Sequence, residues 1–300
     1  MNSIGLPRMS NAKSNDIRII GIGQLGISVA SFFYDDLMTT GIDYNRETFT
    51  SSKIDNGLLL KNFDFASSER MEGIFQAEKG IVIDNLKSPI VFLVGQTEGK
   101  FQETIIPIII KTLKASGVFI GFFAIVPLGA DKKSHIAKMK PIFNFLDVME
   151  IIDSDQLLSS RKLERILDIN NIYYNAIKEK ISAILKVLNN SNILGISVRD
   201  IKMMTEMFGP IYLKILNYSF KNFSVIERDF FEHISSLELS KIKRLYLIFE
   251  VSNDIDSTEI ISFLKRIKSR IPGIDIRQGF IHSDNDFGLI ILHFGNIWLP

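Results

Sequence analysis

Short apolar runs recur along the first half of the chain. They are "IRIIGIG" (17–23), "IVIDN" (81–85), "PIVFLVG" (89–95) and "VFIGFFAIVP" (118–127). Continuous apolar runs bounded by Gly or Pro are typical of strands that are buried on both faces in a parallel sheet. The pattern therefore predicts a buried strand at each of these segments.

Segments with helical spacing of apolar residues lie between these runs. "QLGISVASFFYDDLMTTG" (24–41) is predicted to form a helix that ends at Gly41, and "GIDYNRE" (41–47) is a weaker strand candidate. "ETIIPIIIKTLKASG" (103–117) is predicted to form a second helix. Strand, helix and strand in this order predict right-handed crossovers and a parallel sheet with helices on both faces.

A long helix is predicted after this α/β region. From Ser159 to Leu188 the chain contains neither Gly nor Pro, and its apolar residues are three and four positions apart. This predicts one helix of about 25–30 residues, well above the average of about 11–12. The segment "NNSNILGIS" (189–197) interrupts it.

A smaller unit follows, with mixed helical and alternating patterns. Residues 199–209 and 257–271 are predicted helices, and 244–252, 275–283 and 287–295 are predicted strands. This order indicates an α+β domain whose sheet has one solvent-exposed face. The predicted fold class is α/β, with a Rossmann-like parallel sheet, a long central helix and a smaller α+β domain. The expected boundaries are a loose tail over 1–15, the parallel-sheet domain over 16–158, the central helix and the start of the next loop over 159–192, and the α+β domain over 193–300.

Composition and charge exclude several classes of function. The 300 residues are 46% hydrophobic and 23% charged, with 35 basic and 34 acidic side chains and a net charge of +1. This balance argues against a general nucleic-acid binder, which relies on clustered Lys and Arg. The chain has no cysteine, which excludes disulfides, thiolate metal sites and a Cys nucleophile, and its four histidines lack metal-ligand spacing. We expect no metal site from these residues.

The sequence predicts a cytoplasmic protein without direct membrane insertion. The N-terminal residues 1–16 are polar and lack the apolar core of a signal peptide. The longest apolar stretches, 103–113 and 117–130, are shorter than the roughly 20 residues that a bilayer crossing needs.

Three glycines, Gly21, Gly23 and Gly26, follow the first predicted strand in the pattern G-x-G-x-x-G. This pattern binds dinucleotide phosphates at a strand-to-helix turn, and Asp43 lies where a ribose-binding acid is expected. A Rossmann-type NAD(P)-binding protein is therefore one interpretation. Asp43 argues against it, because the residue falls inside the weak strand 41–47 and not at a strand end. The glycines could also serve only to pack the helix closely on the strand.

The order of these parts resembles the tubulin/FtsZ superfamily, and FtsZ more closely than tubulin, over about residues 16–296. The segment "VFLVGQTEGKFQETIIPII" (91–109) lies without gaps over the family's apolar strand, glycine-rich phosphate loop and helix start. "FAIVPL" (123–128) and "IIDSDQLL" (151–158) resemble two further family segments. The resemblance implies that residues 16–158 bind GTP or GDP, with Mg²⁺ only alongside GTP. It also implies self-association or binding to another FtsZ/tubulin-like filament subunit.

Carried over position by position, the resemblance implies a nucleotide site. Asn171 falls where the family has a base-contacting Asn or Asp, and Asp131 could replace a ribose-contacting Glu. Simpler roles remain open, with Asn171 as a solvated helix position and Gly95 and Gly99 as turn residues. The implied nucleotide-binding residues are Gly21, Gly23, Gln24, Gly26, Ser28, Asn45, Gly95, Gly99, Lys100, Thr104, Asp131 and Asn171.

The phosphate loop departs from the family pattern. Of the family's Gly-Gly-Gly-Thr-Gly-Thr-Gly, "EGKFQET" (98–104) keeps only the glycine at Gly99. Glycines there turn backbone N–H groups toward phosphate through conformations that cost other residues about 1–3 kcal/mol each. Glu98 and Glu103 also bring negative charge toward a triphosphate, and Lys100 offsets only part of it.

The loop that in FtsZ reaches the next subunit's nucleotide also lacks part of the family's acidic motif here. The family's Asn-x-Asp-Phe-Ala-Asp carries acids that polarise the attacking water, whereas Gly195, Ser197 and Asp200 stand at the aligned positions here. Asp200 is the candidate catalytic acid, although it could equally be a helix N-terminal acid favoured by the dipole. Loss of a positioned acid or base typically lowers the rate by about 10²–10⁴-fold.

These features favour a divergent FtsZ-like protein with weak or lost GTP binding and hydrolysis, a pseudo-GTPase. It would act by self-assembly or by modulating a tubulin-like filament. The first alternative is an active GTPase of the FtsZ family, in cell division or filament formation. The Rossmann-type protein is the second alternative, although a dehydrogenase has no need for a long helix that links two domains.

Overall fold

The structure is a computed structural model, and the chain forms two compact units. They span residues 1–178 and 179–300, so the boundary lies inside a helix. The predicted tail (1–15), the strand predicted over 81–85 and residues 190–197 of the interrupting loop lie outside the described residues. The structure describes residues 16–60, 73, 86–159, 166–189, 198–217, 223–251, 257–282 and 288–295.

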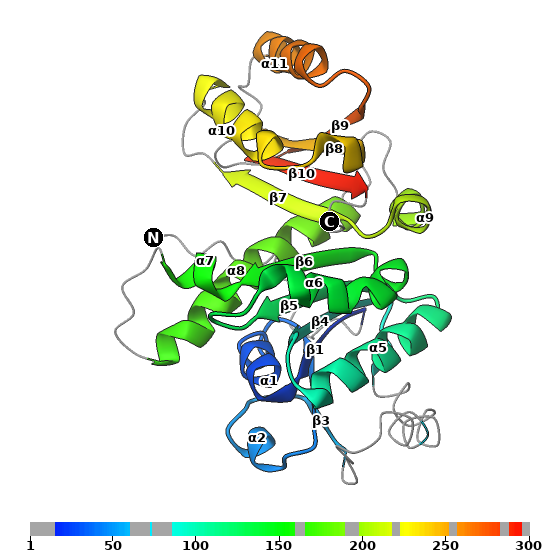
Figure 1. Cartoon of the computed structure of the whole chain (residues 1–300), viewed down its shortest axis with the longest axis vertical. Helices are drawn as coiled ribbons and strands as arrows, with labels where there is room; N and C mark the ends of the chain where they lie inside the picture. The colour runs from blue at the N-terminus through cyan, green and yellow to red at the C-terminus, as the bar shows by residue number, and fades with distance from the viewer. Residues whose placement is uncertain are drawn as a thin grey trace. The chain divides into compact units, whose positions relative to one another are not determined.

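The first unit is built on a six-stranded sheet (Figure 1). All neighbouring strands are parallel, in the order β3-β2-β1-β4-β5-β6. β1 (Ile17–Ile22) and β5 (Phe119–Val126) are buried at every position, as their apolar residues predict for strands covered on both faces. Arg18 of β1 is also buried, and its guanidinium donates to Ser88 Oγ and Thr40 Oγ1. The other strands are β2 (Met38–Asp43), β3 (Asn56–Leu59), β4 (Ile90–Gln96) and β6 (Val148–Asp153).

Helices follow the strands of this sheet. α1 (Gly23–Ser31) packs on β1, β2 and β4, and α5 (Lys100–Ala115) packs on β5. The others are α2 (Glu47–Thr50), α6 (Lys132–Met139), the 3-10 helix η1 (Lys140–Phe145), α7 (Ser154–Ser159) and α8 (Ile166–Asn189). α8, with 24 residues, confirms the predicted long helix from residue 166 onward, whereas residues 160–165 of that prediction lie outside the described residues and Ser159 ends α7. In the described part of the chain, no helix is long and apolar enough to cross a membrane.

The helix predicted over 24–41 is wrong in its second half. α1 ends at Ser31, and the residues before Gly41 belong to β2, which pairs in parallel with β1. Thr39 and Thr40 are completely buried in this strand. Their β-branched side chains suit a strand better than a helix. The pairing partner that favours the strand is therefore non-local, and helical spacing in the sequence does not reveal it.

The second unit is built on a four-stranded sheet in the order β7-β10-β8-β9 (Figure 1). β8 and β9 are parallel, whereas β10 is antiparallel to both β7 and β8. β7 and α10 are absent from the sequence prediction. The strands are β7 (Tyr212–Asn217), β8 (Ile242–Val251), β9 (Asp275–His282) and β10 (Gly288–Gly295). The helices are α9 (Val198–Phe208), α10 (Phe223–Ser235), the 3-10 helix η2 (Leu239–Lys241) and α11 (Ser257–Arg270).

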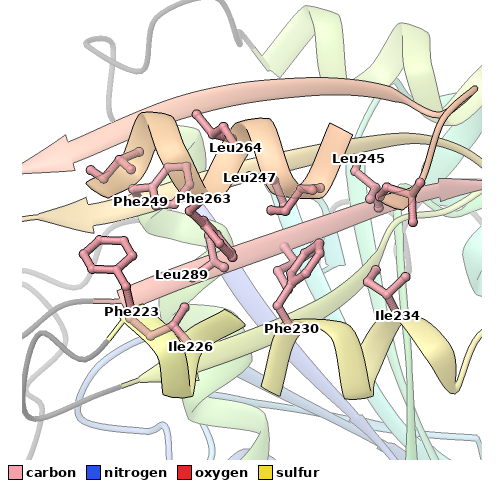
Figure 2. Close-up of a cluster of buried hydrophobic side chains, with 14 of the residues drawn as sticks. Phe223, Ile226, Phe230, Ile234, Leu245, Leu247, Phe249, Phe263, Leu264 and Leu289 are labelled. Carbon is pink, nitrogen blue, oxygen red and sulfur yellow. The ribbon is translucent and has the colours of Figure 1, made fainter. Parts of the chain in front are cut away.

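Alternate residues of this sheet form a core with α10 and α11 (Figure 2). Side chains two positions apart in a strand share a face, so one row of apolar residues can face both helices. Phe230 is completely buried, and its ring meets that of Phe263 edge-on at 5.7 Å. The residues labelled in Figure 2 are Phe223, Ile226, Phe230 and Ile234 of α10, Leu245, Leu247 and Phe249 of β8, Phe263 and Leu264 of α11, and Leu289 of β10.

The prediction that this sheet has one solvent-exposed face is wrong for its inner strands. β10 is buried at all eight positions, because α9 also packs against it. The C-terminal part of α8 adds Lys186, whose Nζ lies 2.6 Å from Glu250 Oε1 on β8. The edge strand β9 keeps solvent-exposed side chains such as Arg277 and Gln278, and Lys243 is exposed near the start of β8.

A buried pair of histidines joins α10 to β10. The Nε2 atoms of His233 and His293 lie 3.0 Å apart, so one neutral ring donates a hydrogen bond to the other. Burial lowers the pKa of His233 to about 4, and the charges of Lys214 and Lys180 act in the same direction. Burial, with a smaller effect of His233, lowers the pKa of His293 well below its ordinary value.

We expect the free energy of unfolding to fall as the pH drops from 6.5 toward 4. The unfolded chain then binds protons on both histidines while the folded chain keeps them neutral, so this contribution is complete above pH 6.5 and lost toward pH 4. For His233 the loss is about 2–3 kcal/mol. Urea denaturation over this range measures the loss. His233→Gln should flatten the pH dependence, whereas the matched change His282→Gln, at an exposed position, should not. An equal slope in both variants would contradict this expectation.

Candidate functional site

The strand order places a candidate binding site beside β1 and β4. The order reverses between these two neighbours, because the chain proceeds from β1 to β2 on one side and from β4 to β5 on the other. The connections leave in opposite directions at such a point, and ligands of open parallel sheets bind at the carboxyl ends of the strands there. Here the two strands end at Ile22 and Gln96.

Gly21 and Gly26 allow a close approach of backbone to backbone. A Cβ on Gly21 would collide with the carbonyl oxygen of Gly26, and a Cβ on Gly26 would collide with the carbonyl oxygen of Val94. These two glycines therefore pack α1 against β1 and β4. Gly95 has ordinary contacts, since its Cβ would lie 3.4 Å from Ile22 Cβ and 3.5 Å from Ile106 Cδ1.

Gly23 and Gly99 form the bends of the two loops, with φ of +70° and +106°. Side chains rarely adopt such a φ, so glycine is required at both positions. The side-chain amide of Gln102 lies over both: a Cβ on Gly23 would be 2.5 Å from Gln102 Nε2, and a Cβ on Gly99 would be 2.5 Å from Gln102 Oε1. Gln102, which the sequence analysis does not assign to the site, therefore fills the space between the glycine bends.

The segment "EGKFQET" is mostly helical. α5 begins at Lys100, directly after the bend at Gly99, and the N–H of Glu103 donates to the Gly99 carbonyl. No residue other than glycine in the described part of the chain has a positive φ. Phe101, Gln102 and Glu103 therefore escape the backbone strain that a glycine-type phosphate loop would impose on them. In its place these residues form the first turn of α5.

Aromatic packing closes the neighbouring side of the site. Phe101 is only 2% exposed, and its ring centroid lies 5.2 Å from that of Tyr44, which follows β2. Asp43 is the last residue of β2, so the prediction that it lies in the middle of a strand, away from the carboxyl end, is wrong. Its Oδ1 accepts hydrogen bonds from the N–H groups of Tyr44 (2.7 Å) and Asn45 (3.1 Å). The carboxylate therefore orders the turn after β2.

Two further predicted ligands have structural partners. Asn45 Oδ1 accepts the N–H of Glu47 at the start of α2. Asp131 caps α6 by accepting the N–H groups of Lys133 (3.1 Å) and Ser134 (3.2 Å). These bonds stabilise helix N-termini, so each side chain has a structural role in this chain.

Charge around the loop is partly balanced by α6. Lys138 Nζ lies 2.9 Å from Glu103 Oε1, and this hydrogen bond is the main reason that the pKa of Lys138 is raised. Beneath the loop, Thr97 Oγ1 and His135 Nδ1 are 2.9 Å apart and both residues are buried. These α6 residues are not predictable from the sequence, because nothing local in "DKKSHIAKM" indicates a contact with Thr97 or Glu103.

The other predicted ligands are not brought into one cluster. Gln24 is exposed, Ser28 and Thr104 are half-buried, and Asn171 is exposed on α8. Nearby on α8, Tyr173 is buried, and its hydroxyl lies 2.7 Å from Ser154 Oγ. Burial raises the pKa of this phenol, and the bond to Ser154 opposes the rise. The catalytic candidate of the sequence analysis, Asp200, lies in the first turn of α9 in the second unit.

The residues at this site do not fit a triphosphate seated on both glycine bends. A phosphate in contact with the backbones of Gly23 and Gly99 would need the volume that the Gln102 amide occupies. Glu98 is exposed at the same bend and adds negative charge. In this structure the Gln102 side chain fills the space between Gly23 and Gly99, where a phosphate-binding loop would leave room for phosphate oxygens.

Comparisons with known proteins identify the architecture. The sequence matches no protein-family model, and no curated protein matches it. CetZ from Methanosaeta thermophila has a TM-score of 0.71 at 13% identity, covering 93% of this chain and 86% of that chain. FtsZ from M. jannaschii has 0.68 at 12% identity, covering 94% and 91%. A GTPγS-form protofilament of TubZ from Bacillus thuringiensis serovar israelensis has 0.70 at 10% identity, covering 97% and 89%. At these identities the likeness concerns the fold alone.

Proposed function

From a chain that has the fold of the tubulin/FtsZ superfamily, we propose a cytoskeletal subunit that acts by assembly, with weak or lost GTP binding and hydrolysis. The subunit associates with copies of itself or with another FtsZ/tubulin-like filament. The observation that carries the proposal is the Gln102 amide in the space between Gly23 and Gly99.

Support for assembly comes from the kind of structures that share the fold. The TubZ structure is a protofilament, and CetZ2 from Haloferax volcanii is described as a GTPγS-bound protofilament. A fold that stacks into filaments in these proteins makes stacking the first function to test in this one.

Support for a degenerate nucleotide site comes from competing uses of its polar groups. Asp43, Asn45 and Asp131 already accept backbone hydrogen bonds. The first turn of α5 carries Phe101 and Gln102 where a glycine loop would expose bare N–H groups. A nucleotide must therefore displace side chains as well as bind, which lowers its affinity.

The proposal is tested by calorimetric titration with GTP and with GTPγS, followed by a phosphate-release assay at high protein concentration. We expect binding weaker than micromolar and almost no turnover. Sedimentation with and without nucleotide should give the same assembled fraction. Micromolar binding with brisk, concentration-dependent turnover would instead establish the active GTPase.

Gln102→Ala is the sharpest variant for this test. Removal of the amide frees the space over Gly23 and Gly99, so we expect GTP affinity to rise by about tenfold, the equivalent of one lost competing contact. Gln156→Ala is the matched control, because Gln156 is an exposed glutamine on α7 and is not among the implied nucleotide-binding residues. Equal affinity in the two variants would mean that Gln102 does not obstruct the nucleotide.

A further inference from the structure

The second unit contains a polar cavity of about 470 Å³ beside the edge strand β9. Its size is within the range of small-molecule sites. Four elements line it: α9, β8, β9 and α11. Its cationic side chains come from three of them, with Arg244 on β8, Arg277 on β9 and Lys268 on α11. The cavity lies entirely within the second unit.

Arg244 is poorly satisfied by its protein partners. Its Nε lies 2.6 Å from Asp275 Oδ2, but this ion pair lacks hydrogen-bond geometry. Its Nη1 donates to the thioether sulfur of Met204 at 2.9 Å, and a thioether is a weak acceptor. Its Nη2 has no hydrogen-bond partner among the residues that the structure describes. A half-buried guanidinium in this state favours an external oxygen acceptor.

Other donors on the cavity wall also lack acceptors. Lys268 Nζ, the Gln278 amide and the Tyr246 hydroxyl have no hydrogen-bond partner in the described part of the chain. Tyr246 is itself only 7% exposed, so its hydroxyl is held in place by the packed ring. Ammonium, guanidinium, amide and phenol groups together offer several N–H and O–H bonds to one oxygen-rich ligand.

The charge of the cavity is positive after its carboxylates are counted. Arg244, Lys268 and Arg277 stand against Asp200 in the wall and Asp275 beside it. Asp275 is shared between two arginines, with Arg277 Nε at 3.2 Å from Oδ1. A cationic ligand would add to this positive charge, whereas an anion with several oxygens balances the charge and also accepts hydrogen bonds from the donors.

We propose that this cavity binds the phosphate group of a small phosphorylated molecule. Arg244 and Arg277 supply guanidinium forks that match phosphate oxygens, and Lys268 supplies a point charge from the opposite helix. The site differs from the glycine bends of the first unit, and it requires no nucleotide there.

Inorganic pyrophosphate is the probe, titrated into the full chain by calorimetry. We expect saturable binding that weakens as the salt concentration rises, because opposite charges attract less when they are screened. Lys268→Gln and Arg277→Gln should each lower the affinity about tenfold or more. Both side chains are exposed, so neither change should unfold the protein. Lys265→Gln, an exposed lysine on the same helix that does not line the cavity, should leave the affinity unchanged.

Three results would overturn the proposal. The first is the absence of pyrophosphate binding to the full chain. The second is an affinity that falls equally in the Lys265→Gln control, or that changes in Gln102→Ala, because the probe would then bind elsewhere. The third is succinate binding as tightly as pyrophosphate, which would assign the cavity to carboxylates.

Discussion

Phe230→Ala should lower the free energy of unfolding of the second unit by about 3–5 kcal/mol, the range for a buried Phe truncated to Ala. Phe230 is completely buried in the centre of the core that joins α10, α11 and the sheet. Its ring also meets that of Phe231 edge-on at 5.3 Å. Truncation removes these contacts and leaves a cavity that the stiff strands β8 and β10 cannot close.

Hydrogen exchange of the β8 and β10 amides in increasing urea measures this loss unit by unit. Ile261→Ala is the matched control, because Ile261 lies on α11 with 50% of its surface exposed. We expect the control to change stability by less than about 0.5 kcal/mol. Similar losses in both variants would mean that α10 is not held by this core.

Gly26→Ala should lower the stability of the first unit by about 2–3 kcal/mol, toward the upper end of the cost of overpacking. The added methyl group would collide with the carbonyl oxygen of Val94. That atom belongs to the central strand β4, so it cannot rotate away as a side chain would. α1 must therefore shift away from the sheet, and the bend at Gly23 must shift with it.

Gly117→Ala separates this steric effect from backbone strain. Gly117 has a φ of +74°, and nothing lies within 4 Å of the Cβ position. The cost at Gly117 is therefore conformational alone, about 1 kcal/mol. Urea denaturation followed by circular dichroism compares the two variants. A smaller loss in Gly26→Ala than in Gly117→Ala would contradict close packing of α1 on β4.

Some elements are predictable because their sequence signal is local. β1 and β5 consist mainly of apolar residues, and the burial of those residues follows from the composition. The burial of Arg18 in β1 does not, because it depends on hydrogen bonds to Ser88 and Thr40 elsewhere in the chain. α11 has apolar residues at helical spacing, and the helix forms at Ser257–Arg270, close to the predicted 257–271. In these segments, propensity and burial favour the same structure.

Other elements are not predictable in this way. Thr39 and Thr40 become strand residues only because β1 pairs with them, and the preceding residues have helical spacing. β10 is buried on both faces because α9 covers it in addition to the core helices. Neither the pairing partner nor the covering helix can be inferred from local periodicity.

The candidate site likewise has features that are predictable from local sequence and features that depend on non-local contacts. The glycine pattern and the strand-to-helix order predict turns at Gly21, Gly23, Gly26 and Gly99. Of these, Gly23 and Gly99 do form bends with positive φ. The sequence pattern did not distinguish packing glycines from conformational ones. That distinction depends on how close another backbone comes, as Val94 comes to Gly26.

The sequence alone predicts a parallel α/β region, a long helix and a smaller α+β unit. These elements are predictable because the spacing of apolar residues is a local property of the sequence. Only the tertiary structure places Gln102 between Gly23 and Gly99, and brings Arg244, Lys268 and Arg277 to one cavity. Both depend on segments that are far apart in sequence and meet only when the strands pair and the helices pack. Contacts of this kind fill the space between the two glycine bends in the first unit, and they line a cationic cavity in the second.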